Sequence, residues 1–161
     1  MKYGVKNSGG IESSLEKQKL TCKLKYNKDY FFQTDEFKEK FKNTYITVSI
    51  SNQYLEYYQH GKLALSSPVV TGYGGDTPYG TYSILYKTTN ARLVGANNEY
   101  DTVVNYWMAF IGNSHGFHDA TWRHSFGGNI YTYNPTHGCV NMPYYKVQQL
   151  YNMVEIGTPV Y

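Results

Sequence analysis

From Tyr45 onward, apolar and polar side chains alternate in short runs, the pattern of half-buried β-strands. In YITVSI the apolar residues occupy every second position. Runs of this kind cover residues 45–50, 53–59, 62–70 and 80–86. The segment VVNYWMAFI, residues 103–111, is almost continuously apolar or aromatic, which predicts a central strand. We therefore expect a mainly β fold, either a sandwich or a barrel-like arrangement.

Turn-forming residues separate the predicted strands. Ser51-Asn52 and His60-Gly61 lie between the first three runs, and TGYGGDTPYG, residues 71–80, is dense in glycine and proline. Such compositions favour turns and loops. The short run GFH, residues 116–118, reads as one more strand that ends in a polar turn.

One helix is predicted near the C-terminus. Pro143 suits a first helical turn, and Gly157 with Pro159 supplies a stop. Between them, apolar side chains follow the spacing of a single helical face, at Val147, Leu150, Tyr151 and Val154. The fold class is therefore mainly β, with one helix directly after Cys139.

The first 43 residues differ from the rest of the chain. They are polar and rich in lysine, with one helical candidate at Asp35–Asn43, where Phe37 and Phe41 would share a face. A core this small is insufficient for independent folding. We expect residues 1–43 to be a linker or the tail of a preceding domain, and residues 44–161 to form one catalytic domain.

Composition and charge narrow the function classes. The net charge is only +3, from 15 basic and 12 acidic residues spread along the sequence, which argues against nucleic acid binding. The sequence contains 19 tyrosines, common in extracellular β-proteins but also in genomes biased towards this residue. No apolar run could span a membrane, and the N-terminus does not resemble a secretory signal. The protein is thus either cytoplasmic or a segment whose leader and anchor have been removed.

The segment NPTHGCVNMP, residues 134–143, contains the candidate chemistry. Two cysteines, Cys22 and Cys139, are too few for a disulfide framework, and we expect both to be free. Small and polar residues surround Cys139, whereas an inert thiol sits among aliphatic ones. A catalytic thiol needs a base, an oxyanion site and access. Gly138 permits close approach of substrate, and the N–H groups of Gly138 and Cys139 are candidate oxyanion donors.

A histidine must supply the base. His60 and His124 fall in predicted turns and loops, which leaves His115, His118 and His137 as candidates. His118 ranks first because it ends a short strand, and strand ends aim side chains reliably. His137 lies two residues before Cys139, so in an extended segment the two side chains would share a side.

These residues resemble the YkuD family of L,D-transpeptidases, in its firmicute branch. The family signature is a histidine followed later by Ser/Thr-His-Gly-Cys, and here HDATWR and THGCVNMP place His118 21 positions before Cys139. The resemblance extends from about Thr44 to Tyr161. It implies that Cys139 is the nucleophile and His118 its base, and that His137 and Gly138 line the site.

The resemblance also suggests substrate contacts. Residues 121–134, between the catalytic pair, would form a lid. Thr136 replaces a commoner serine, and Asn141 replaces an arginine found in many relatives, which affects the binding of substrate carboxylates. The candidate substrate contacts are Thr136, Asn141, Trp122, Tyr131, Tyr133 and Asp119, the last being either a turn residue or a group that orients the histidine.

The implied function is peptidoglycan L,D-transpeptidation. Cys139 would form a thioester with one tetrapeptide stem, and a second stem would resolve it into a 3-3 crosslink. The resemblance implies peptidoglycan stem peptides as partners, carbapenem-type β-lactams as covalent inhibitors, and no metal, cofactor, nucleic acid or membrane contact from this segment. It places the protein outside the cell, in the wall or on the outer face of the cytoplasmic membrane.

Three alternatives remain open at this stage. The same residues could hydrolyse the thioester, as in an L,D-carboxypeptidase or a cysteine peptidase that trims wall peptides. His115, His118 and Asp119 could form a zinc site, although their spacing is not that of helical ligands. The tyrosine-rich surface could also serve a non-catalytic module that binds the cell wall.

Overall fold

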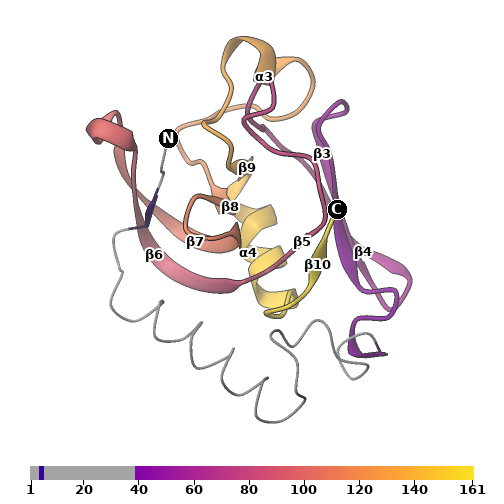
Figure 1. Cartoon of the computed structure of the whole chain (residues 1–161). Coiled ribbons are helices and arrows are strands. Elements are labelled where there is room, and N and C mark those ends of the chain that lie inside the picture. The colour runs from indigo at the N-terminus through magenta and orange to yellow at the C-terminus, as the bar shows by residue number, and fades with distance from the viewer. Residues whose placement is uncertain (1–3, 6–38) are drawn as a thin grey trace.

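The computed structural model describes residues 4–5 and 39–161, which form two five-stranded sheets packed face to face (Figure 1). The first sheet has the order β1-β6-β7-β8-β9. Its strands are antiparallel apart from the parallel pair β8 and β9. Their bounds are β1 Gly4–Val5, β6 Tyr86–Val94, β7 Asp101–Ile111, β8 His115–Asp119 and β9 Val140–Met142.

The second sheet has the order β4-β3-β2-β10-β5. β10 runs parallel to β2, and the other pairs are antiparallel. The bounds are β2 Tyr45–Ser49, β3 Tyr54–Gln59, β4 Lys62–Pro68, β5 Tyr82–Ser83 and β10 Pro159–Val160. The expectation of a mainly β sandwich is confirmed.

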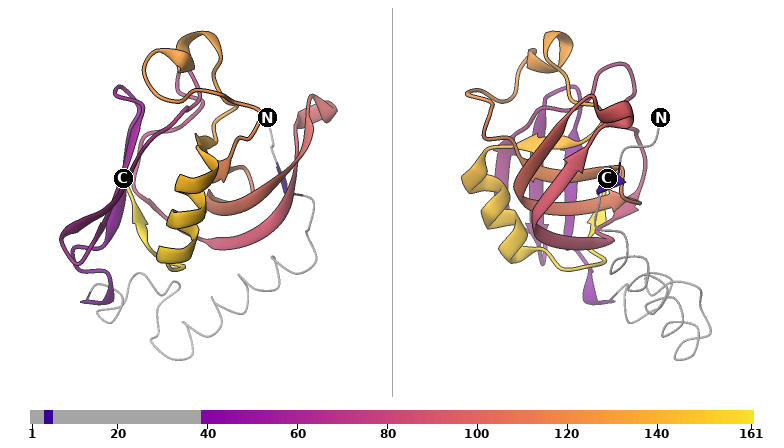
Figure 2. Two further views of the ribbon diagram at one scale, coloured as in Figure 1. Left: turned by 180° about the vertical axis from the view of Figure 1, so that it is seen from behind. Right: turned by 90° about the vertical axis from the view of Figure 1, so that its left-hand side faces the viewer.

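Helix α4, Tyr144–Met153, lies between the two sheets and completes the core (Figure 2). Val147 and Leu150 are fully buried on its inner face, and Val154 is buried just beyond its end. The core they join draws on both sheets, with Ile46 and Leu55 from one and Phe117 from the other. The predicted apolar face is therefore confirmed, but the helix ends before Gly157, with Val154 as its C-cap.

The strand predicted over residues 80–86 is only partly correct. β5 holds two residues of it, and a separate long strand, β6, starts at Tyr86 and continues to Val94. The sequence did not predict β6 because residues 87–90, KTTN, are all polar. The middle of this strand is exposed, so apolar and polar side chains do not alternate there. Two short helical segments were also not predicted, the 3-10 turn η2 at Ala96–Asn98 and helix α3 at Ile130–Tyr133.

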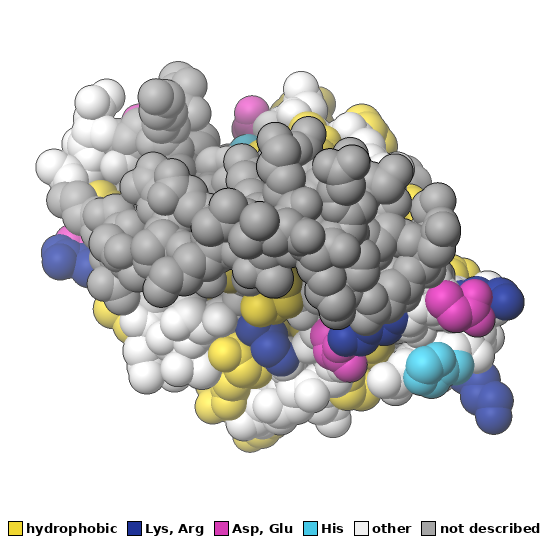
Figure 3. Space-filling view, turned by 60° about the horizontal axis from the view of Figure 1, so that its bottom comes forward, with side chains coloured by type: hydrophobic (Ala, Val, Ile, Leu, Met, Phe, Trp, Pro, Cys, Tyr) yellow, Lys and Arg dark blue, Asp and Glu magenta, His cyan; other side chains and the backbone are white. Residues whose placement is uncertain are grey.

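Part of the N-terminal region packs on the domain. Backbone pairing joins Gly4 to Val94, so β1 extends the edge of β6. In the predicted helix, Glu39 and Lys40 are helical and Phe41 is buried, whereas residues 35–38 lie outside the described residues. The expectation that Cys22 is free also falls outside the described residues. Within the described ranges, no helix is long and apolar enough to cross a bilayer. On the face shown in Figure 3, acidic and basic side chains are interspersed.

Candidate active site

Residues 136–139, here the nucleophile segment, form a tight turn fixed by two threonine hydroxyls. Thr136 Oγ1 accepts the N–H of Gly138 at 3.1 Å and donates to the carbonyl of Cys139 at 2.6 Å. Thr77 Oγ1, from the loop 71–80, donates to the carbonyl of Gly138 at 2.9 Å and accepts the N–H of Gly72 at 2.8 Å. Both peptide groups next to Cys139 are therefore held from buried side chains.

Gly138 is required here for two reasons. Its φ is +118°, a conformation that residues with a Cβ rarely adopt. A Cβ at this position would also lie 2.5 Å from His115 Nε2 and 2.7 Å from the carbonyl oxygen of Asp76. The segment therefore needs glycine both for its backbone angle and for the close approach of its neighbours.

The thiol of Cys139 is partly exposed and lies over the start of β8. Its Sγ is 3.6 Å from the carbonyl of Ser114, to which it donates, and it accepts the N–H of Gly116. Burial raises the pKa of the thiol to about 11, against the smaller opposing effect of the Gly116 N–H. At neutral pH Cys139 is consequently a protonated thiol that needs a base to react.

The β8–β9 register brings His118 to the same side of the sheet as Cys139. His118 pairs with Asn141 and the preceding Phe117 pairs with Val140, whose side chains both face the core between the sheets. Because side chains alternate along a strand, His118 and Cys139 both face away from that core. Trp107, the partner of His118 on β7, stacks under the imidazole at 5.8 Å between ring centroids.

The hydrogen bond of His118 fixes its tautomer. Nδ1 lies 2.8 Å from the carbonyl oxygen of Asp119, and a carbonyl can only accept, so Nδ1 carries the proton. The neutral ring then has its basic lone pair on Nε2. Burial lowers the pKa of His118, Arg123 acts in the same direction, and the Asp119 carbonyl and charge oppose them. The imidazole is therefore neutral at pH 7 and can act as a base.

The other two candidate histidines lie at the site in different roles. His115 has both ring nitrogens engaged, Nε2 at 3.0 Å from the Asp76 carbonyl and Nδ1 at 2.8 Å from Ser114 Oγ. It joins the loop 71–80 to β8. His137 is exposed and stacks on Tyr100 at 5.1 Å, and the positive φ of Gly138 removes the extended backbone on which its predicted orientation relied.

Two of the predicted substrate contacts, Asp119 and Thr136, have their side chains engaged within the protein. Asp119 is 1% exposed, and its carboxylate accepts from Asn105 Nδ2 at 2.7 Å and from the Tyr106 N–H at 2.9 Å. Its hydrogen bond to His118, at 2.8 Å, is made by its backbone carbonyl, so the carboxylate acts on the imidazole only through its charge. The hydroxyl of Thr136 is buried and used within the nucleophile segment, so Thr136 positions Cys139 and is not available to substrate.

Asn141 remains a candidate substrate contact. It is 3% exposed, shares the side of the sheet that holds Cys139 and His118, and its backbone exchanges two hydrogen bonds with Val70. Its Oδ1 is buried and has no partner within the described residues. A buried acceptor of this kind is costly unless a donor satisfies it.

The lid, residues 121–134, carries the aromatic candidates. Trp122 is 49% exposed with its ring 6.0 Å from that of His118, which makes it a wall of the site. Tyr131 packs against Tyr73 of the loop 71–80 at 6.0 Å. Tyr133 is 75% exposed. The N–H of Gly127 donates to the carbonyl of Val69 at 2.9 Å and fastens the middle of the lid.

Several residues of the site escaped the sequence reasoning. Ser114 and Gly116 act on the thiol through backbone atoms, and Trp107 supports His118 from a neighbouring strand. Thr77 lies in the glycine-rich loop, where the density of small residues indicated a close approach of backbones. For these residues the sequence offered two features at most: the polar turn before GFH, residues 116–118, and the glycine-rich composition of residues 71–80.

The three residues of the alternative zinc site are not gathered around one point. The imidazoles of His115 and His118 bind different carbonyls, and the carboxylate of Asp119 points to β7. Across residues 4–5 and 39–161, no group of three His, Cys, Asp or Glu side chains could hold a metal ion.

Residues 43–161 match the family described as YkuD, L,D-transpeptidase catalytic domain. A Cys-to-Ser mutant of Enterococcus faecium L,D-transpeptidase superposes with a TM-score of 0.70 and 38% identity, over 74% of this chain and 49% of that one. This chain thus spans about half the length of that relative. No match was found among curated proteins.

Two further structures are similar. The catalytic domain of E. faecium L,D-transpeptidase acylated by ertapenem has a TM-score of 0.65 and 38% identity, over 73% of this chain and 95% of that one. L,D-transpeptidase 3 of Mycobacterium tuberculosis, in complex with a faropenem-derived adduct, has a TM-score of 0.63 over 73% of this chain and 59% of that one. At 20% identity it shares the fold alone. From the matched residues and these likenesses, the chain belongs to the YkuD family of L,D-transpeptidase catalytic domains.

Proposed function

We propose that this domain catalyses peptidoglycan L,D-transpeptidation through an acyl-enzyme on Cys139. The observation that carries the proposal is the position of Cys139 and His118 on one side of the β8–β9 pair. Burial favours the neutral thiol of one and the neutral imidazole of the other. Family membership supports the transpeptidase chemistry, and the acylated E. faecium domain supports a covalent intermediate.

In the first step, Cys139 Sγ attacks the carbonyl carbon of the third residue of a tetrapeptide stem. The thiol proton moves to Nε2 of His118 as the S–C bond forms. The C–N bond to the terminal D-Ala then breaks, and His118 returns the proton to the leaving amine. The product is a thioester on Cys139 and free D-Ala.

In the second step, the side-chain amine of another stem attacks the thioester. His118 takes the proton from this amine as the new C–N bond forms. The S–C bond then breaks, and His118 returns the proton to Sγ, which regenerates the Cys139 thiol and the neutral imidazole. The result is a 3-3 crosslink between two stems. The lid restricts the access of water to the thioester, which favours transfer over hydrolysis.

The tetrahedral intermediates need a donor for the oxyanion. Of the two amides expected to provide it, that of Gly138 donates to Thr136 Oγ1, so we assign the main role to the N–H of Cys139. The Oδ1 of Asn141, which has no partner within residues 4–5 and 39–161, accepts an N–H of the bound stem. Trp122 forms the wall beside His118. The wall location of such stems places the site of action outside the cytoplasmic membrane.

Intact-protein mass spectrometry after incubation with a carbapenem tests the proposal. We expect one covalent adduct, absent from Cys139→Ala and formed about 10²- to 10⁴-fold more slowly by His118→Ala. His60→Ala, which removes an exposed histidine, is the matched control and should react as wild type. A folded protein that forms no adduct, or an adduct that persists in Cys139→Ala, overturns the proposed mechanism.

The products formed from tetrapeptide stems distinguish transfer from hydrolysis. A crosslinked dimer supports the transpeptidase, whereas tripeptide alone identifies an L,D-carboxypeptidase with the same residues. A protein that binds wall fragments equally well after Cys139→Ala, and forms neither product, is a binding module.

A further inference from the structure

Arg123 joins the start of the lid to its end. It belongs to the turn that follows β8, where its N–H donates to the carbonyl of Ala120 at 3.0 Å. Its guanidinium reaches across the lid, with Nη1 donating to the carbonyl of Asn134 at 2.9 Å and Nη2 to that of Pro135 at 3.2 Å. Thr136, the first residue of the nucleophile segment, follows directly. One side chain therefore spans from the end of the base-bearing strand to the beginning of the turn that holds Cys139.

The charge of Arg123 is not neutralised by the contacts that hold it. Both acceptors are neutral carbonyls, and no ion pair of Arg123 occurs within the described part of the chain. Among the residues that the structure describes, its buried Nε has no hydrogen-bond partner. Burial lowers the pKa of the guanidinium but leaves it charged at neutral pH. A partly buried and uncompensated cation costs free energy. A neutral side chain with hydrogen-bond donors could bind the same two carbonyls, so the positive charge at this position requires a separate explanation.

Arg123 follows His118 by five residues and lies in the turn that comes directly after β8. The charged groups that act on this imidazole are Arg123, which disfavours the protonated form, and Asp119, which favours it. Cys139 on the same side of the sheet is a neutral thiol. Arg123 thereby offsets the carboxylate of Asp119, which hydrogen-bonds to Asn105 and to the N–H of Tyr106 on β7.

We propose that Arg123 is a positioning residue for acyl transfer, which joins the two ends of the lid at the nucleophile segment and keeps a permanent positive charge at the end of the strand that carries His118. The proposal rests on the proposed function, because it assumes that His118 is the base and Cys139 the nucleophile. Its two parts are separable, since the fastening depends on the two-pronged shape of the guanidinium and the electrostatic effect depends only on charge.

Two substitutions separate these parts. Arg123→Lys keeps the positive charge but cannot bridge two carbonyls with a planar fork. Arg123→Gln removes the charge and keeps a donor. Arg92→Gln is the matched control, because Arg92 is an exposed arginine of β6 that pairs with Asp101 away from the lid. All three are compared with wild type after their folding is checked by near-UV circular dichroism.

The first measurement is the rate of acylation by a carbapenem between about pH 5 and about pH 8. Without the cation, the imidazole of His118 stays protonated to higher pH. The acidic limb of the pH–rate profile of Arg123→Gln should therefore move upward by about half a pH unit, which means a roughly threefold lower acylation rate on that limb. Arg123→Lys should keep the wild-type limb. The control should match wild type throughout.

The second measurement is the ratio of crosslinked dimer to tripeptide formed from tetrapeptide stems. Both Arg123 variants should hydrolyse more of the thioester, because a loosened lid admits water. We expect the ratio to fall by about threefold or more in Arg123→Lys, with little change in the control.

The outcomes separate this proposal from the one on which it rests. If wild type forms no adduct on Cys139, the proposed function fails. If wild type reacts normally and Arg123→Gln keeps both the wild-type limb and the wild-type product ratio, only the role of Arg123 is wrong. Should Arg123→Gln not fold, Arg123→Lys decides, since a wild-type product ratio in that variant contradicts the fastening.

Discussion

At the scale of single residues, the conformation of the segment that holds Cys139 depends on the residues packed around Gly138. Gly138 has a φ of +118°. In addition, the imidazole of His115 and the backbone of Asp76 lie within 3 Å of the position that a Cβ at Gly138 would occupy. Neither neighbour can move freely, because His115 Nε2 is bonded to the Asp76 carbonyl at 3.0 Å. The tolerance for any side chain at Gly138 is therefore low.

We predict that Gly138→Ala lowers the free energy of unfolding by about 2 to 4 kcal/mol, from backbone strain and overpacking together. Denaturant unfolding measures the change. Gly128→Ala is a matched control in the lid, since Gly128 also has a positive φ of +58° but no atom within 4 Å of its Cβ position. It should cost only about 1 kcal/mol. Equal losses in the two variants would show that the contacts with His115 and Asp76 do not matter.

A second prediction at this scale concerns Thr77. Its hydroxyl serves the carbonyl of Gly138 and the N–H of Gly72, and it is 5% exposed. Thr77→Val leaves both groups unpaired and frees the nucleophile segment to shift, so we expect acylation to slow by about ten- to a hundredfold. Thr77→Ser restores the hydroxyl and should recover most of the rate. A Thr77→Val enzyme with the wild-type acylation rate would contradict the positioning role.

The sequence could propose Cys139 and His118 as the nucleophile and the base because a thiol and an imidazole are recognised by residue type alone. It could not predict the contacts that set their protonation. The carbonyl of Ser114, the N–H of Gly116 and the carbonyl of Asp119 are backbone groups, which every residue possesses. Only the fold decides which of them meet the thiol and the ring.

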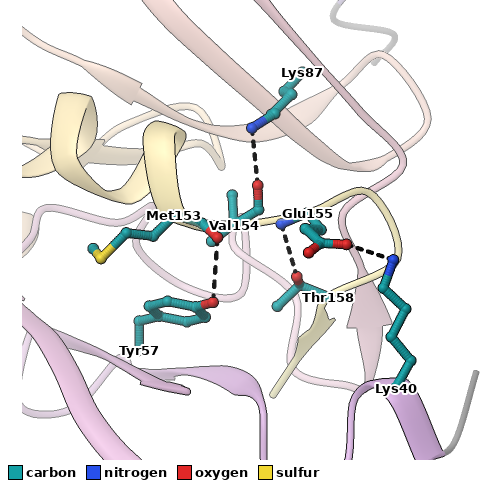
Figure 4. Close-up of polar contacts among 7 residues, drawn as sticks. All are labelled: Lys40, Tyr57, Lys87, Met153, Val154, Glu155 and Thr158. Carbon is teal, nitrogen blue, oxygen red and sulfur yellow. Dashed lines mark hydrogen bonds and ion pairs between the residues drawn. The ribbon is translucent and has the colours of Figure 1, made fainter. Parts of the chain in front are cut away.

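At the scale of elements, the C-terminal end of α4 is held from β6. Lys87 Nζ donates to the carbonyls of Tyr151 at 2.7 Å and Val154 at 2.9 Å, and it lies 4.7 Å from the centre of the Tyr151 ring. Figure 4 shows Lys87 meeting the Val154 carbonyl, with Glu155 and Thr158 on the same turn. The cation thereby satisfies carbonyls that a helix end leaves without partners.

We predict that Lys87→Met destabilises the protein by about 1 to 3 kcal/mol, because two charge-assisted hydrogen bonds disappear while the aliphatic stem is kept. Lys62→Met, at the exposed start of β4, is the control and should change stability by less than about 0.5 kcal/mol. Thermal or denaturant unfolding of both variants tests this. Equal effects would mean that Lys87 does not cap α4.

Elements in which apolar residues recur at a regular spacing could be predicted from the sequence. Elements that form only by pairing with a distant strand could not. The strands β2, β3, β4 and β7 and the helix α4 follow their apolar spacing closely. β9 has three residues and β10 has two, and each is stabilised by parallel pairing with a strand distant in sequence. Such short segments carry too few positions for a period to appear.

At the scale of the whole molecule, the site exists because the topology places β9 beside β8. The lid separates these strands in sequence, and their parallel register sets His118 and Cys139 on one side of the first sheet. The loop 71–80 then closes on the nucleophile segment through Gly72, which bridges to Thr136. Resemblance to a family implied this arrangement, whereas spacing along the chain could not specify it.

Burial of titratable groups across the molecule makes its stability depend on pH at both extremes. The pKa of His118 is lowered in the folded state, so the unfolded chain binds the extra proton and stability declines as pH falls below about 6.5. The pKa of Cys139 rises from 9.0 to about 11, so its stabilising contribution is complete below pH 9 and is lost as pH rises towards 11. Burial also raises the pKa of Tyr57, Tyr86 and Tyr151, which adds to the alkaline decline.

The difference between wild type and Cys139→Ala isolates the thiol from the tyrosines. Because the tyrosines are common to both proteins, we predict that this difference in unfolding free energy is constant from about pH 7 to about pH 9 and then falls by about 1 to 2 kcal/mol towards pH 11. The partial exposure of Cys139 keeps the loss below that of a fully buried thiol. Urea titrations at closely spaced pH values supply the measurement. A difference that instead increases between about pH 7 and about pH 9 would mean that the resting thiol is already ionised, and His118 would then have no proton to remove from it.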